Sequence, residues 1–278
     1  MGSKRWWVAL VAAVAGTCMA REEAMPLYEL GVGMAGLSSP HYLGAAQNHN
    51  LVVPVPYLVY RGERLRIDRS GVKTFLVDEE RLDINISLSG SLPVDSDDNR
   101  MRRGMPDLDP MGEIGPTLRY TLWQGRDGQR QVRLDLPVRA AITADGFDLD
   151  YRGLSSSPGI AFYSTVYDWR WSASYAAIFS DRRYHGYFYD VDTPYVTAQR
   201  DHYRAGSGYT ASRLSVSTTH YFDNWFVGAF ASYYSLHGAA NEDSPLVRER
   251  GQFSAGVMVT WFFKKSSTLV SRQPEAEF

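Results

Sequence analysis

The chain has 278 residues, with 29 lysines and arginines against 31 aspartates and glutamates, which gives a formal net charge of −2. The positive charges are dispersed along the chain instead of forming one basic face, so we exclude nucleic acid as a partner. The mean hydropathy of −0.30 is too low for a helical membrane protein. Beyond residue 20, no segment approaches the roughly 18 uninterrupted apolar residues that a spanning helix needs.

The first 20 residues have the features of a secretory signal peptide. Lys4 and Arg5 precede an apolar run over 6–16, and the small-residue site Cys18-Met19-Ala20 follows. We therefore expect a signal peptide over 1–20. The mature chain would have no cysteine, because the single cysteine of the sequence lies in this leader. Lipidation of that cysteine is the alternative, although the threonine before it fits a lipidation site poorly.

Apolar and polar residues alternate strictly in several stretches of the chain. In 82–88, leucine and isoleucine alternate with aspartate, asparagine and serine, so an extended strand would have one aliphatic and one polar face. A soluble β-sandwich would alternate equally, but it would not favour aromatic residues at strand ends, such as Trp261 and Phe263. The sequence therefore predicts an all-β fold, a transmembrane antiparallel β-barrel of the outer membrane. The pattern recurs at 114–122, 132–140, 169–179 and 253–263.

The polar faces of these strands are predicted to line the barrel lumen. Charges of both signs occur on them, and such charges can pair across a narrow barrel, which would offset their desolvation and occlude the pore. We expect a narrow or plugged lumen, with a narrow porin-like channel as the alternative. The expected lumen charges are Arg81, Asp83, Glu113, Arg119, Arg133, Asp135, Arg139 and Arg170.

Long and short connections alternate along the chain, as external loops and periplasmic turns do in bacterial barrels. This parity predicts about 12 strands. A hairpin within 64–77 leaves 10–14 possible, because its arms fall short of the roughly nine to eleven residues that a tilted strand needs. Pro54 and Pro56 cannot donate to a sheet, so a distorted region is expected near the first strands. The predicted external loops are 37–49, 93–110, 143–158, the aromatic-rich 181–208, and 238–251.

No pattern in the chain indicates a catalytic, cofactor or metal site, and we predict a protein that is not an enzyme. The local nucleophile and base candidate is His220 with Ser217 or Thr218, but such catalysis also needs a third group that orients the base. We expect His220 to be an interfacial polar residue beside a periplasmic turn.

Acidic residues gather in three predicted external segments, 95–98, 107–109 and 145–150. They lack the spacing and the glutamate of a calcium loop, so solvated loops are the expected outcome. The neighbouring Arg100, Arg102 and Arg103 are candidates for contact with lipopolysaccharide phosphates. Lipid and lipopolysaccharide of the outer membrane are therefore expected partners, and the oligomeric state stays open.

Several blocks of the sequence match one family pattern. They are Gly31-Val32-Gly33, His41-Tyr42-Leu43-Gly44, Val53-Pro54-Val55-Pro56-Tyr57, Arg103-Gly104-Met105-Pro106-Asp107, Asp223-Asn224-Trp225 and Asp243-Ser244-Pro245-Leu246-Val247. With these blocks the chain resembles the MltA-interacting protein family, also called MipA/OmpV. The resemblance implies a Gram-negative outer-membrane barrel that holds a murein lytic transglycosylase near a penicillin-binding synthase. Other members of the family are described as porin-like or as surface adhesins.

The end of the chain departs from the pattern of that family, whose members usually finish on the aromatic residue of the closing strand. Here residues 264–278 follow it. We therefore predict a barrel domain over 21–263 and a periplasmic tail over 264–278, with the assembly signal at Trp261 and Phe263.

Overall fold

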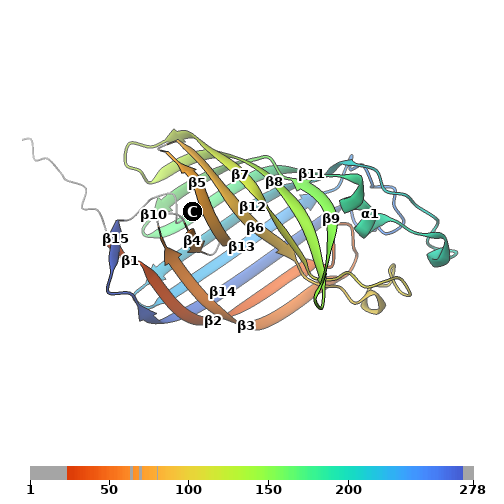
Figure 1. Cartoon of the computed structure of the whole chain (residues 1–278), viewed down its shortest axis with the longest axis horizontal. Coiled ribbons are helices and arrows are strands. Elements are labelled where there is room, and N and C mark those ends of the chain that lie inside the picture. The colour runs from red at the N-terminus through yellow and green to blue at the C-terminus, as the bar shows by residue number, and fades with distance from the viewer. Residues whose placement is uncertain (1–23, 63–64, 69–70, 80, 272–278) are drawn as a thin grey trace, which may run out of the picture.

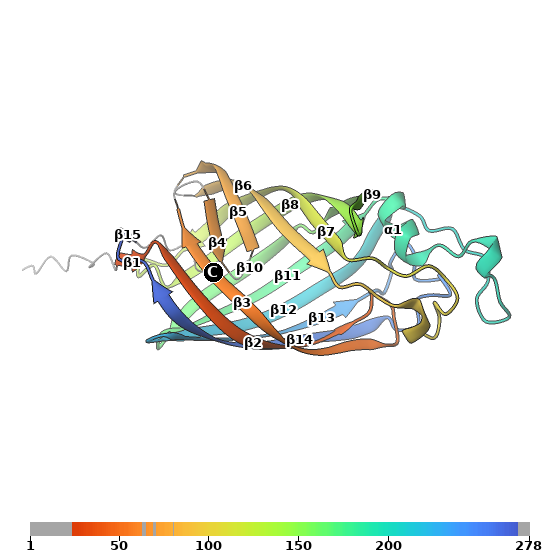
Figure 2. The ribbon, with the colours of Figure 1, turned by 60° about the horizontal axis from the view of Figure 1, so that its bottom comes forward.

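The computed structural model describes residues 24–62, 65–68, 71–79 and 81–271; the predicted signal peptide lies outside them. One antiparallel sheet closes on itself as a barrel (Figures 1 and 2). Its strands are β2 (Tyr28–Pro40), β3 (Asn48–Arg61), β4 (Leu65–Asp68), β5 (Gly71–Asp78), β6 (Leu82–Ser91), β7 (Met111–Gln124), β8 (Arg130–Asp145), β9 (Asp148–Ser156), β10 (Gly159–Val166), β11 (Trp169–Ser180), β12 (Gly208–Phe222), β13 (Trp225–Ser235) and β14 (Gly251–Lys265).

The closed sheet has 13 strands but 12 positions around the barrel. β9 and β10 share one position, because both pair with β8 on one side and with β11 on the other. Closure is completed by the pairing of β14 with β2. The prediction of a twelve-stranded transmembrane barrel is confirmed. No helix in the described ranges is both long enough and apolar enough to cross a membrane.

The segment predicted as an external loop over 143–158 forms a β-hairpin and not an irregular loop. β8 continues to Asp145, Gly146 and Phe147 form the turn, and β9 returns along β8. β9 meets β11 only at Phe179 and Ser180, so most of this hairpin stands beyond the end of β11. Aspartate and glycine are unfavourable in strands, so the composition of β9 did not predict a strand there.

The alternation of the sequence places side chains on the faces that it predicts. On β14, Phe253 and Val257 expose 69% and 61% of their surface on the outer face, whereas Ser254 and Thr260 are buried on the inner face. Aromatic side chains gather at the strand ends near the short turns, as in the interfacial girdle of an outer-membrane barrel. They are Trp169, Trp171, Phe222, Trp225, Trp261 and Phe263.

The barrel wall is incomplete between β3 and β6. In the part of the chain that the structure describes, β3 pairs with β4 only at Tyr60 and Arg61, and β5 pairs with β6 only over 83–87. Among the described residues, 48–59 of β3 therefore have a strand partner on the β2 side alone. Pro54 and Pro56 lie in this free edge, where a missing N–H costs little. β3 pairs with β2 in continuous register, so the strand itself is not distorted. The irregularity expected from the two prolines is instead the lack of a second neighbouring strand along most of β3.

The two ends of the barrel differ. The long connections, with α1 (Arg182–Tyr189), η1 (Ser96–Asp98) and η2 (Thr193–Tyr195), gather at one end (Figure 1). At the other end, β1 (Ala24–Pro26) pairs with β15 (Leu269–Ser271) in a separate two-stranded sheet. The first residues of the tail thus extend β14 to Lys265 and then form β15. We call the loop end the cap and the sheet of β1 and β15 the terminal sheet.

Candidate functional site

Charged side chains form a connected cluster on one wall of the lumen. Arg119 of β7 lies 3.7 Å from Asp83 of β6 and 3.5 Å from Asp135 of β8. Arg133 donates to Asp135 at 3.0 Å and also donates to the hydroxyl of Tyr163 on β10. These predicted lumen residues do lie together, and their opposite charges pair as expected. Pairing offsets the cost of removing the ions from water and narrows the space for solutes.

An aromatic cluster fills the lumen toward the terminal sheet. Tyr57 of β3 stacks on Phe226 of β13 with ring centroids 5.5 Å apart, and it meets Phe262 of β14 edge-on at 5.7 Å. Tyr221 adds a ring 4.9 Å from Phe226. Phe226 and Phe262 are almost fully buried although they face the lumen, so this end of the barrel is occupied by side chains. The alternation of the sequence did not predict that these four rings form a cluster inside the lumen.

The cap has its own apolar core, built from loops that are far apart in the sequence. Val191, Ala205 and Leu246 are almost completely buried there. Burial raises the pKa of Tyr42 to about 12, so its hydroxyl stays protonated and donates to the carbonyl of Leu246 at 3.0 Å. The full cluster is Tyr42, Ala45, Val94, Met101, Leu108, Met111, Ala141, Phe188, Tyr189, Val191, Ala205 and Leu246. The aromatic residues of 181–208 were the sequence signal for this core.

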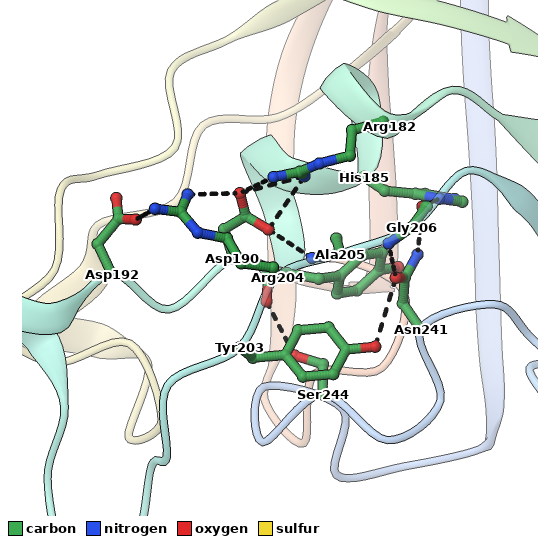
Figure 3. A network of polar contacts seen from close by, with 11 residues as sticks. Arg182, His185, Asp190, Asp192, Tyr203, Arg204, Ala205, Gly206, Asn241 and Ser244 are labelled. Carbon is green, nitrogen blue, oxygen red and sulfur yellow. Dashed lines mark hydrogen bonds and ion pairs between the residues drawn. The ribbon is translucent and has the colours of Figure 1, made fainter.

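A polar network holds the base of the cap together (Figure 3). Asp190 accepts from Arg182 at 3.2 Å, from Arg204 at 3.4 Å and from the backbone N–H of Ala205 at 2.6 Å. The Asn241 side chain accepts from Gly206 N–H at 2.8 Å and so joins the loop over 181–207 to the loop over 236–250. Figure 3 shows these groups converging from both loops. Their cross-linking fixes the cap over the barrel mouth.

His185 of α1 is fully buried beside this network (Figure 3). Its Nδ1 lies 2.6 Å from the carbonyl of Gly206, and its Nε2 lies 2.7 Å from Thr210 Oγ1 on β12. Desolvation is the largest influence and lowers the pKa of His185, partly opposed by the bond to Gly206. The lowered pKa favours the neutral form of His185 in the folded cap.

The acidic and basic residues of the predicted external loops serve mainly within the cap. Asp95 accepts from the N–H of Asp97 at 2.8 Å and so caps η1. Arg102 is buried and donates to the carbonyl of Phe188 at 3.2 Å, so its predicted contact with lipopolysaccharide is corrected to a contact inside the cap. Arg103 is exposed. Within the described ranges, no group of three histidine, cysteine, aspartate or glutamate side chains could hold a metal ion.

The nucleophile and base candidates do not meet. Ser217 shares a hydrogen bond of 2.7 Å with Ser172 inside the lumen. His220 lies 3.1 Å from the carbonyl of Asp168 and stacks on Trp169 with ring centroids 4.9 Å apart. It belongs to the aromatic girdle at the short turns, which is the interfacial position expected of it.

Ionic contacts anchor the terminal sheet to the barrel. Arg61 at the end of β3 pairs with Glu29 of β2 at 2.7 Å and donates to the carbonyl of Pro26 at 2.8 Å. Lys265 at the end of β14 lies 3.6 Å from the same glutamate. Arg61 and Glu29 are largely buried, so this contact fixes where the chain leaves β1 and enters the barrel.

The structure is similar to those of several solved outer-membrane proteins. The bacterial polysaccharide outer membrane secretin is 8% identical, with 85% of this chain and 99% of that chain covered and a TM-score of 0.44. OpdO of Pseudomonas aeruginosa is 10% identical, with 85% of this chain and 97% of OpdO covered and a TM-score of 0.27. The outer membrane protease OmpT of Escherichia coli is 8% identical, with 87% of this chain and 98% of OmpT covered and a TM-score of 0.28. These scores are too low to carry an argument.

The family comparison is more informative. No match was found among curated proteins. The family described as MltA-interacting protein MipA matches residues 32–263, which is most of the chain and includes every strand of the closed barrel apart from the first residues of β2 and the last residues of β14. The chain therefore belongs to the MltA-interacting protein MipA family, and it is an outer-membrane protein of that type.

Proposed function

We propose that this protein is an outer-membrane scaffold that holds a murein lytic transglycosylase near a penicillin-binding synthase. The family name supports an interaction with a murein-associated protein. The terminal sheet is the observation that carries the proposal. Bacterial barrels usually keep both termini in the periplasm, and the terminal sheet lies at the end of the barrel opposite the cap.

A docking surface needs groups that reach beyond the membrane. The short turns contribute only a few residues each, whereas β1 and β15 form a fixed platform beside them. Leu269 of β15 exposes 59% of its surface on this platform. An exposed apolar residue on a fixed backbone is a suitable anchor for a protein partner, since buried apolar contacts dominate binding energy.

The obstructed lumen also favours a scaffold over a channel. The cap closes one end, the aromatic cluster occupies the other, and the charged wall narrows the space between. The protein surface facing the periplasm is then the part available for function.

Site-specific photo-crosslinking in intact envelopes tests the proposal. We expect p-benzoylphenylalanine at Leu269 to capture a murein hydrolase or synthase. The same probe at Val196, which is 42% exposed at the cap end, serves as the matched control and should capture neither. Equal capture at both positions, or no murein enzyme at Leu269, would count against docking at the terminal sheet.

Deletion of residues 266–278 provides a second readout. Trp261 and Phe263 remain in β14, so we expect the barrel to assemble normally while capture of the murein enzyme decreases. Normal assembly with unchanged capture would move the docking surface to the short turns. Failed assembly would place the assembly signal in the deleted tail.

A further inference from the structure

A cavity of about 570 Å³ lies in the lumen between the charged wall and the aromatic cluster. This volume is in the range of about 300–1,000 Å³ that is typical of small-molecule sites. The cavity has two unlike walls. β7, β8 and β10 contribute Arg119, Arg133, Asp135 and Tyr163, whereas β2, β13 and β14 contribute mainly small and apolar residues.

The apolar wall presents an aromatic ring that nothing covers among the described residues. Phe230 lies on the lumen face of β13 together with the buried Phe226 and Ser232. In contrast to these two residues, Phe230 exposes 41% of its surface. A Cβ at Gly256 would lie 2.5 Å from its ring, so the glycine lets the ring lie close against β14. Ala35 and Met258 extend the same surface. Exposed apolar area of this kind favours contact with the apolar body of a ligand.

The charged wall presents an arginine whose contacts leave donors free. Arg119 Nε lies 3.5 Å from Asp135 Oδ1, and Nη1 lies 3.7 Å from Asp83 Oδ2, both too long for strong hydrogen bonds. Its Nε is buried and makes no hydrogen bond in the described part of the chain. A carboxylate can satisfy such a guanidinium with two parallel charge-assisted hydrogen bonds.

The charge of the cavity lining favours an anion over a cation. Among the described residues that line the cavity, Arg119 and Arg133 face a single carboxylate, Asp135, which leaves a formal excess of +1. Low-dielectric walls strengthen the attraction of such an excess for an anion.

We propose that this cavity binds a small amphipathic monocarboxylate, with its apolar body against Phe230 and its carboxylate on Arg119. The site is independent of docking at the terminal sheet. It gives the filled barrel a ligand-binding role without requiring that solute pass through it.

Equilibrium dialysis of the full-length protein in dodecyl maltoside tests the site, with radiolabelled 2-naphthoate as the probe and micelles alone as the blank. We expect saturable binding of one naphthoate per chain. 2-Naphthylmethanol has the same rings without the charge and should bind about tenfold more weakly or worse. 2-Naphthylmethylamine should not bind above the blank. Equal or tighter binding of the alcohol or the amine would overturn the assignment of the headgroup to Arg119.

Matched variants locate the binding on the two walls. Ala35→Phe fills the cavity and should abolish saturable binding, while Ala231→Phe on the outer face of β13 should leave it unchanged. Arg119→Gln should weaken binding by about tenfold or more, whereas Arg139→Gln, a lumen arginine outside the cavity, should have little effect.

The difference in gel mobility between unboiled and boiled samples verifies that each variant is a folded barrel. Absence of saturable binding by the wild-type protein would overturn the proposal. Equal loss in the cavity variants and their controls would do the same, and so would unchanged binding in folded Ala35→Phe.

Discussion

Neighbouring residues on one strand of this barrel face different media. On β12, Val216 exposes 50% of its surface on the outer face, while Ser217 lines the lumen cavity. Both lie near the middle of the strand, so they share the same depth in the membrane. A charge at these two positions therefore distinguishes the lipid face from the lumen face.

We predict that Val216→Arg lowers the free energy of unfolding by about 2–4 kcal/mol, because an arginine at the bilayer midplane loses its hydration. Ser217→Arg should cost less, since its side chain enters a polar cavity and mainly loses the hydrogen bond to Ser172. Urea titration in phospholipid vesicles measures both. A larger cost at Ser217 would show that the register of β12 is wrong by one residue.

The buried histidine of the cap predicts a pH dependence. The pKa of His185 is lowered by desolvation, so the unfolded cap binds a proton at a higher pH than the folded cap. The stability of the cap should thus be complete above the ordinary histidine pKa of about 6.5 and fall as the pH drops toward the folded pKa. Hydrogen exchange of 182–206 at pH 7.5 and 5.5, corrected for intrinsic rates, should show less protection at the lower pH. In His185→Gln the difference should shrink, and a difference that survives unchanged would exclude His185 as its source.

At the scale of residues, the sequence predicted which side chains face the lumen, but it did not predict which of the charged side chains contact one another. The period of two placed Asp83, Arg119 and Arg133 on the lumen face, as the structure confirms. Which of them meet depends on the register between strands, which no single strand encodes. Arg102 was misjudged for a related reason, because its burial results from loops that converge only when the barrel closes.

At the scale of elements, β3 has the most unusual environment. Its residues 48–59 pair with β2 alone among the described strands, and two prolines lie in the same stretch. Unpaired backbone groups at an edge open more readily than groups shared between two strands. The sequence predicted the hairpin of β4 and β5. It did not predict that β4 pairs with only the last two residues of β3, because that depends on the register between the strands.

We predict faster hydrogen exchange in peptides from 48–59 than in peptides from 253–262 of β14, which is paired on both sides for much of its length. Exchange followed by mass spectrometry on the protein in micelles checks this. Equal protection of the two segments would mean that another segment covers the edge of β3.

On the scale of the whole molecule, closure of the sheet accounts for the expected resistance to denaturation. A closed barrel has no free edge along most of its wall from which unfolding can begin. We predict that unboiled protein migrates differently from boiled protein on a denaturing gel. Identical mobility, together with recovery in the soluble periplasmic fraction, would contradict an outer-membrane barrel.

The central claim is that side chains block this barrel at both ends, so that it does not act as an open channel. Conductance across planar bilayers tests it most directly, with heat-dependent gel mobility as evidence that the added protein is folded. The cap and the aromatic cluster around Phe226 and Phe262 predict no steady conductance after insertion. A stable ohmic conductance from folded protein, at the level of an open water-filled pore, would contradict the account and favour a channel.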